Sequence, residues 1–161
     1  MPIPAIRAAT PDDCGLILEL ITDLARYEKA EHEVLASADD IHRSLFGDEP
    51  AARALICEID GAAVGFAVYF VSYSTWLGKP GLYLEDLYVK PEYRGSGAGK
   101  ALLRELAAEA VAKGYGRFEW SVLDWNEPAI RFYQSIGAEP QDEWIRYRLD
   151  GEALQRFANG S

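Results

Sequence analysis

A turn with three glycines and two basic residues is the feature of the sequence most suited to chemistry. It consists of Arg94, Gly95, Ser96, Gly97, Ala98, Gly99 and Lys100. The turn lies between an apolar run that ends at Val89 and an apolar-periodic segment that predicts a helix over residues 100–113. The first turn of a helix has unpaired N–H groups, and glycines let a phosphate approach the backbone. Residues 94–100 therefore predict a pyrophosphate site.

The spacing within this turn excludes two common nucleotide motifs. A P-loop requires Gly at position 94 and Ser or Thr at position 101, where the chain has Arg94 and Ala101. A dinucleotide fingerprint that starts at Gly95 requires Gly at position 100, which is Lys100. The pattern that fits is Arg-x-x-Gly-x-Gly. A glycine-rich connector without a ligand is the alternative.

Two adjacent carboxylates interrupt an otherwise apolar strand. Glu85 and Asp86 lie within the segment 82–89, where an ionised side chain is costly unless it is paired or functional. Strand alternation predicts that the two side chains point to opposite faces of the sheet. One can then face a cleft while the other anchors the sheet, and a structural ion pair is the alternative for Glu85.

The elements that position these residues follow from hydrophobic period and turn signals. Strands are expected at 6–8, 54–59, 63–71, 82–89, 118–123 and 144–149, with a tight hairpin at Asp60-Gly61 and a loop over 72–81. Helices are expected at 11–28, 37–47, 100–113 and 128–137, with a short helix possible after Gly151. The order β-α-α-β-β-β-α-β-α-β predicts one α/β (α+β) domain over residues 1–161.

Composition excludes several classes of protein. The 161 residues carry a formal charge of −10, which disfavours nucleic-acid binding and favours a cationic substrate. Apolar runs are too short for a membrane span, and the N-terminus does not resemble a signal peptide. Cys14 and Cys57 predict core thiols, and His32 and His42 lack metal-ligand spacing. We expect a cytoplasmic protein with no metal.

The glycine turn and the element order resemble the GNAT N-acetyltransferase superfamily. Four further stretches resemble its diamine (spermidine/spermine-type) acetyltransferase branch: Arg26-Tyr27-Glu28-Lys29, residues 83–89 (YLEDLYV), Trp125-Asn126-Glu127-Pro128 and residues 132–138 (FYQSIGA). The resemblance covers nearly the whole chain. It implies a mixed, mostly antiparallel sheet splayed around acetyl-CoA, a small-molecule amine as acceptor, and a homodimer.

The resemblance also implies roles for individual residues. Glu85 relays the proton of the amine, and Tyr133 protonates the CoA thiolate, although Phe132-Tyr133 also fits a buried aromatic pair. Tyr27 and Glu28 match the amine-binding pair. The residues implied in acetyl-CoA binding are Leu87, Tyr88, Val89, residues 94–100, Asn126 and Tyr133. Asn126 also fits a helix cap, since it precedes Pro128.

The segment before the expected strand at 82–89, which contains Glu85, bears on the identity of the acceptor. Ser74-Thr75 resembles the thialysine Nε-acetyltransferases, whereas polyamine acetyltransferases have Asp-Pro before the tryptophan that corresponds to Trp76. Short hydroxyls suit the α-amino acid end of thialysine or lysine, and Trp76 either lines the pocket or anchors the loop. Three alternatives stay open: a spermidine/spermine acetyltransferase, a protein N-terminus or lysine as acceptor, and a CoA-binding sensor without chemistry.

Overall fold

The computed structural model describes residues 2–160, which form two compact units. One unit ends at Leu123 and the other begins at Asp124, and each is described by itself. The first unit contains strands β1 (Ala5–Ala8), β2 (Arg53–Ile59), β3 (Ala62–Ser74), β4 (Lys79–Val89) and β5 (Phe118–Trp120), and helices α1 (Cys14–Tyr27), α2 (Ala38–Phe46) and α3 (Ala98–Ala112). The second contains α4 (Glu127–Ser135) and α5 (Gly151–Ala158). Short 3-10 turns lie at Pro11–Asp13, Glu31–Glu33 and Pro91–Tyr93.

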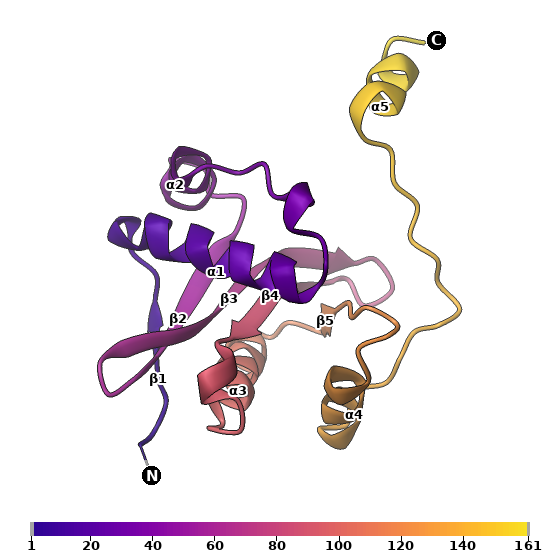
Figure 1. Ribbon diagram of the computed structural model, residues 1–161. Coiled ribbons are helices and arrows are strands. Elements are labelled where there is room, and N and C mark those ends of the chain that lie inside the picture. The colour runs from indigo at the N-terminus through magenta and orange to yellow at the C-terminus, as the bar shows by residue number, and fades with distance from the viewer. Residues whose placement is uncertain (1, 161) are drawn as a thin grey trace. The chain divides into compact units, whose positions relative to one another are not determined.

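The five strands form one mixed sheet in sequence order (Figure 1). The pairs are antiparallel except that of β4 with β5, which is parallel. Helices α1 and α2 pack on one face around Ile17, Leu20, Ile56 and Phe66, which are 4% exposed or less. Helix α3 covers the other face with Leu102 and Leu106. The predicted fold class, a mostly antiparallel sheet flanked by helices, is confirmed.

Local capping signals fix where the first two helices begin. Thr10 caps the turn that leads into α1, and its N–H donates to the Asp13 carboxylate at 2.7 Å. Ser37 caps α2, and its hydroxyl accepts from the N–H of Asp40 at 3.1 Å. Both helix starts have a capping box, which needs only residues three apart in the chain. The predicted hairpin is also present, with positive φ at Asp60 and Gly61.

The predicted loop over 72–81 is wrong. Strand β3 continues to Ser74 and β4 begins at Lys79, so that the two strands pair through Tyr73 and Pro80 and only residues 75–78 turn. The carbonyl of Ser74 accepts from the N–H of Gly78 at 2.8 Å and closes the turn. The Ser, Thr, Gly and Pro residues of this segment suggest a loop, but pairing across a long hairpin outweighs their low strand preference.

The second unit corrects the end of the predicted order. Helix α4 and the short helix α5 are present, but residues 144–149 form no strand. Trp144, Ile145 and Tyr147 are 66%, 80% and 91% exposed. The alternation of this segment is strand-like, yet a strand exists only where another strand accepts its hydrogen bonds. Strand β5 likewise ends at Trp120 rather than at Leu123.

The described part of the chain offers neither a candidate membrane span nor a candidate metal cluster. Within residues 2–160, no helix has both the length and the apolar composition that crossing a bilayer requires. Over the same residues, no cluster of three or more His, Cys, Asp or Glu side chains is arranged to hold a metal ion. A single domain over 1–161 stays a prediction.

Replacing Asp13 tests the cap of α1. Asp13 is 8% exposed and accepts from both terminal nitrogens of Arg7, at 2.8 and 2.9 Å, and Arg7 lowers the pKa of this carboxyl from 3.8 to about 2. A depressed carboxyl pKa stabilises the fold above pH 3.8 and loses this effect as the pH falls toward 2. We expect Asp13→Asn to lower the free energy of unfolding by about 1–3 kcal/mol at pH 7.

Urea unfolding at several pH values measures this effect. The difference between wild type and Asp13→Asn should shrink as the pH falls below 3.8. Asp12→Asn is the matched control, because Asp12 lies in the same turn but is exposed. Equal losses in both variants would show that Arg7 contributes nothing specific through Asp13.

Candidate active site

The glycine turn leads directly into α3, as predicted. Gly95 and Gly97 have φ values of 85° and 88°, and Gly97 is the N-cap of α3. This left-handed conformation favours glycine, and an added Cβ at either position would meet no atom within 4 Å. Ala98 N–H donates to the hydroxyl of Ser96 at 3.3 Å. The N–H groups of Gly99 and Lys100 point out of the first helical turn, where an anion binds favourably.

Arg94 links this turn to the end of α1. Its Nε donates to the carbonyl of Val89 at 3.4 Å, and its guanidinium carbon lies 4.9 Å from the ring centre of Tyr27 and 5.9 Å from that of Tyr88. Contacts of this kind between a guanidinium and an aromatic ring are attractive. Arg94 therefore contacts both Tyr88, which is expected to bind the cofactor, and Tyr27, which is expected to bind the amine. Nothing in the sequence signals this contact, because the residues are far apart in the chain.

Strand β4 has a free edge at the positions expected to bind the cofactor. Its pairing with β5 covers only Leu82–Leu84, although β4 continues to Val89. Beyond Leu84 the strand is paired through β3 alone. Leu87 and Val89 turn their N–H and C=O groups to this edge, whereas those of Tyr88 point to β3, as the N–H of Lys90 does when it donates to Val64. The Val89 carbonyl also accepts from Arg94 Nε. An extended ligand that carries amide groups can pair there as a strand does.

A bulge places Glu85 at the start of this free edge. Tyr69 pairs with Leu84 and Val68 pairs with Asp86, so Glu85 has no partner on β3. A bulge interrupts the alternation of side chains along a strand. The expectation that Glu85 and Asp86 point to opposite faces rested on that alternation, and it does not apply to a bulged pair.

Three carboxylates of the first unit influence one another. Burial, followed by the charges of Glu85 and Glu28, raises the pKa of Asp86 from 3.8 to about 6. Burial and the charge of Glu85 also raise the pKa of Glu28. We call Glu28, Glu85 and Asp86 the carboxylate cluster. A cationic ligand would relieve its repulsion. Asp86 was not among the expected site residues. Its burial marks it as part of this cluster, and the sequence does not reveal that burial.

The end of α1 fixes Tyr27 and Glu28. Ala30 N–H donates to the carbonyl of Ala25 at 2.8 Å and Lys29 N–H donates to that of Arg26 at 3.1 Å, which is a Schellman ending. Lys29 adopts the left-handed conformation that this ending needs, with φ of 61°. Glu31, just beyond this ending, pairs with Arg26 at 2.7 Å.

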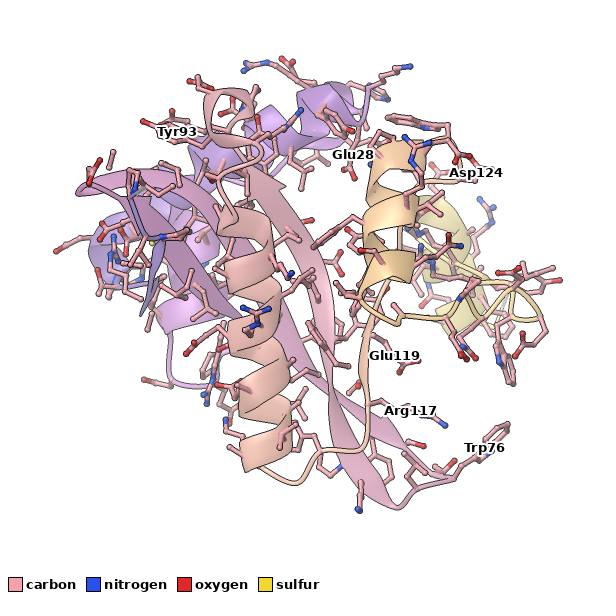
Figure 2. The ribbon with its side chains drawn as sticks, turned by 90° about the horizontal axis from the view of Figure 1, so that it is seen from below. Glu28, Trp76, Tyr93, Arg117, Glu119 and Asp124 are labelled. Carbon is pink, nitrogen blue, oxygen red and sulfur yellow. The ribbon has the colours of Figure 1, made fainter. Side chains whose placement is uncertain are left out.

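The other expected acceptor-binding residues lie at the far end of the hairpin. Figure 2 shows Trp76 and Arg117 at one end of the sheet and Glu28 and Tyr93 at the other. Glu85 follows Lys79 by six residues, or roughly 20 Å of strand. The Ser74 hydroxyl accepts from Leu77 N–H at 3.2 Å. Trp76 is 79% exposed, and the Arg117 guanidinium carbon lies 5.9 Å from the centre of its ring. Within the first unit, Ser74, Thr75 and Trp76 are therefore not brought to Glu85.

Asn126 and Tyr133 belong to the second unit. The Asn126 side chain accepts from Ala129 N–H at 3.4 Å and caps α4, which is one of the two roles that the sequence left open. Tyr133 is half-buried, and its ring lies 5.8 Å from that of Phe132. Both residues stay predictions as parts of the site.

Comparisons with known proteins show which family this chain resembles. Residues 17–138 match the family model described as the acetyltransferase (GNAT) family. The thialysine N-epsilon-acetyltransferase of Bos taurus is 40% identical over 98% of this chain and 99% of its own. An L-ornithine N5-acetyltransferase of Arabidopsis thaliana is 32% identical over 93% of this chain and 86% of its own.

A solved structure resembles the chain as a whole. An integron cassette protein from the mobile metagenome of V. cholerae has a TM-score of 0.80 and 26% identity, over 96% of this chain and 97% of that one. The family match spans most of the chain and includes the glycine turn, the bulged strand and α3. This chain is therefore a member of the GNAT family of acetyltransferases.

Proposed function

We propose that this acetyltransferase transfers an acetyl group from acetyl-CoA to the terminal amine of a small amino acid of the thialysine or lysine type. The observation that carries the proposal is the carboxylate cluster, which lies in the same unit as the glycine turn. The name of the Bos taurus relative supports the acceptor class. The Ser74-Thr75 pair supports the same class.

The described residues fit acetyl-CoA, which supplies the activated acetyl thioester. The first turn of α3 and Arg94 suit a pyrophosphate, since they offer N–H groups and a positive charge. The free edge at Leu87–Val89 suits the amide groups of the pantetheine arm. Gly95 and Gly97 leave open space above the turn, which side chains there would fill.

Glu85 and Tyr133 would carry the two proton transfers. An alkylammonium has a pKa of about 10.4 and must lose a proton before its nitrogen attacks. Glu85 accepts that proton, directly or through a water molecule. As the new N–C bond forms and the C–S bond breaks, the nitrogen releases its second proton to water and the Tyr133 phenol donates its proton to the departing sulfur. Exchange with solvent then restores both side chains.

A homodimer would explain the position of Ser74, Thr75 and Trp76. These residues lie far from Glu85 in their own unit, so they would contact the acceptor only in the site of a second copy. We expect light scattering to give a dimer, and a monomer at assay concentration would contradict this arrangement. A cytoplasmic location stays our expectation from the sequence.

The acceptor is tested by a panel of amines. Thiol release from acetyl-CoA is measured with thialysine, lysine, spermidine, spermine and putrescine side by side. We expect the highest kcat/KM for thialysine or lysine, because the Ser74 and Thr75 hydroxyls suit an α-amino acid end. Preference for spermidine or spermine would identify a polyamine acetyltransferase instead. Binding of acetyl-CoA without turnover of any amine would favour a sensor.

The proton-transfer roles predict two separate losses. Tyr133→Phe and Glu85→Gln should each lower kcat about 100-fold or more, the usual contribution of general acid or base catalysis. The affinity for CoA, measured by calorimetry, should stay within about threefold, or about 0.7 kcal/mol. Tyr147→Phe is the matched control, since Tyr147 is 91% exposed in the same unit as Tyr133. Full activity in both variants would contradict the assignment.

The carboxylate cluster predicts a pH-dependent stability. The pKa of Asp86 is raised from 3.8 to about 6, so the wild type loses stability as the pH rises between these values. Asp86→Asn should therefore raise the melting temperature at pH 8 by about 3 °C, the shift for about 1 kcal/mol. The gain should vanish near pH 4, where Asp86 is protonated in the fold.

Thermal unfolding at both pH values measures this difference. Asp60→Asn is the matched control, because Asp60 lies in an exposed hairpin turn that accepts Asn. A destabilised Asp86→Asn variant at pH 8 would mean that the ionised Asp86 has a stabilising partner.

A further inference from the structure

Glu119 on β5 is a carboxylate that the site described above does not use. Its side chain is exposed, and in the part of the chain that the structure describes no hydrogen bond or ion pair holds it. The nearest cation along the chain is Arg117, whose guanidinium carbon lies 5.9 Å from the ring centre of Trp76 instead. Figure 2 shows Glu119 and Arg117 between Glu28 at one end of the sheet and Trp76 at the other. Glu119 is therefore available to a cationic ligand.

The pairing of the strands places Glu119 and Asp86 on one face of the sheet. Paired residues of neighbouring strands point to the same face, as do residues two apart on one strand. Asp86 pairs with Val68. Phe70, two residues further along β3, pairs with Tyr83, and Tyr83 in turn pairs with Glu119. The bulge adds its extra residue to β4, so the alternation along β3 is intact.

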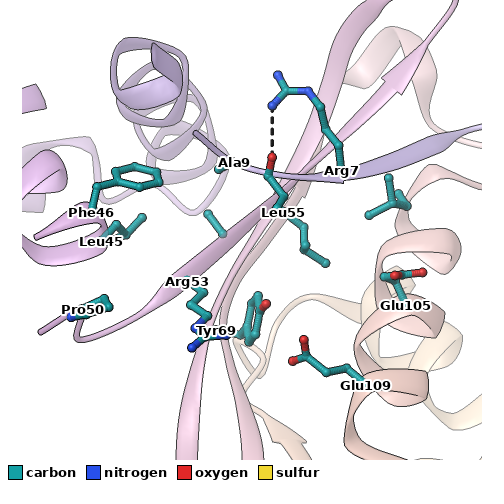
Figure 3. A pocket seen from close by; sticks show the side chains of 13 residues that line it. Arg7, Ala9, Leu45, Phe46, Pro50, Arg53, Leu55, Tyr69, Glu105 and Glu109 are labelled. Carbon is teal, nitrogen blue, oxygen red and sulfur yellow. Dashed lines mark hydrogen bonds between the residues drawn. The ribbon is translucent and has the colours of Figure 1, made fainter. Parts of the chain in front are cut away.

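This face is the one that α1 and α2 cover. Val68 belongs to the core under these two helices. Tyr69, the next residue, points to the opposite face, where it lies beside Glu109 of α3 (Figure 3). Glu28 at the end of α1 contributes to the raised pKa of Asp86, so these two carboxylates are close to each other. An ammonium group bound at the carboxylate cluster would therefore lie on the α1 side of the sheet.

An aromatic pair lies beside Glu119 on this face. The ring centres of Phe70 and Tyr83 are 5.2 Å apart, both side chains are half-buried, and neither belongs to the core under α1 and α2. The Tyr83 hydroxyl shares a hydrogen bond of 2.7 Å with that of Ser121, which fixes the orientation of the ring. The aliphatic part of a ligand can pack on such a pair.

The spacing of these carboxylates suits an acceptor with two amines. Tyr83, which pairs with Glu119, precedes Glu85 by two residues, or roughly 7 Å of strand. The charges that raise the pKa of Asp86 are those of Glu85 and Glu28 and not that of Glu119, which agrees with a greater distance to Glu119. The four-carbon stem of lysine separates two amines by a comparable length.

We propose that Glu119 determines the specificity for the acceptor by binding its α-ammonium group. The Phe70–Tyr83 pair packs against the methylene stem, and the ε-amine lies at the carboxylate cluster. This inference rests on the proposed function, since it extends the acceptor site of that reaction. It identifies the acceptor as a molecule with a second ammonium group one lysine stem away from the amine that is acetylated. A monoamine lacks the group that Glu119 recognises.

Titration of the full-length, ¹⁵N-labelled protein in the presence of CoA tests the inference without turnover. Lysine is compared with 6-aminohexanoate, which lacks only the α-ammonium group. The wild type should bind lysine about fivefold more tightly, or by about 1 kcal/mol, as expected for an exposed ion pair. Glu119→Gln should weaken the binding of lysine by about the same factor and should not weaken that of 6-aminohexanoate. The preference for lysine then disappears.

Glu105→Gln is the matched control, because Glu105 is an exposed glutamate of α3, which covers the opposite face. It should bind both ligands as the wild type does. A preference for lysine that persists in Glu119→Gln, or equal weakening of both ligands, would overturn the inference. The absence of saturable shifts with lysine up to about 20 mM would overturn it as well. Thiol release from acetyl-CoA, measured separately, tests the proposed function. Lysine binding that depends on Glu119, without turnover of any amine, would contradict acetyl transfer but support this inference.

Discussion

Beyond Leu84, strand β4 is paired on one side only, and the arrangement of the site depends on this constraint. A strand inside a sheet normally forms backbone hydrogen bonds with a neighbouring strand on each side. Here the parallel partner β5 ends at Trp120, so among the described residues no strand neighbours residues 85–89 on that side. The bulge at Glu85 occurs where the pairing stops. The same local irregularity therefore frees the backbone edge and sets a carboxylate at its start.

The charges around this edge fall into two regions, one positive and one negative. The first turn of α3 and Arg94 form a positive region suited to phosphates, in a chain whose formal charge is −10. The carboxylate cluster forms a negative region suited to an ammonium group. Arg94 of the positive region stacks on Tyr27, which is adjacent to Glu28 of the negative region. This contact connects the two regions. Desolvation of Glu28 and Asp86 costs stability in the free protein, and a cationic acceptor bound there, as we propose, would offset part of that cost.

The sequence predicts those parts of the molecule that depend on nearby residues. Thr10 with Asp13, Ser37 with Asp40, and the glycines before α3 encode helix starts within three or four positions. Features that depend on distant partners are different. The extent of the β3–β4 hairpin is set by pairing, and residues 144–149 have strand-like alternation without a partner strand. The contact of Arg94 with Tyr27 also joins residues remote in sequence.

The strand order of the sheet has a consequence for how the protein folds. Each strand pairs with the strand that follows it in the chain. The largest pairings, within the β2–β3 and β3–β4 hairpins, join residues close in sequence and close only short loops. These hairpins can form early, because little chain entropy is lost before their contacts form. The first unit contains all five strands and their helices, so during synthesis its sheet can assemble before the segment after Leu123 has left the ribosome.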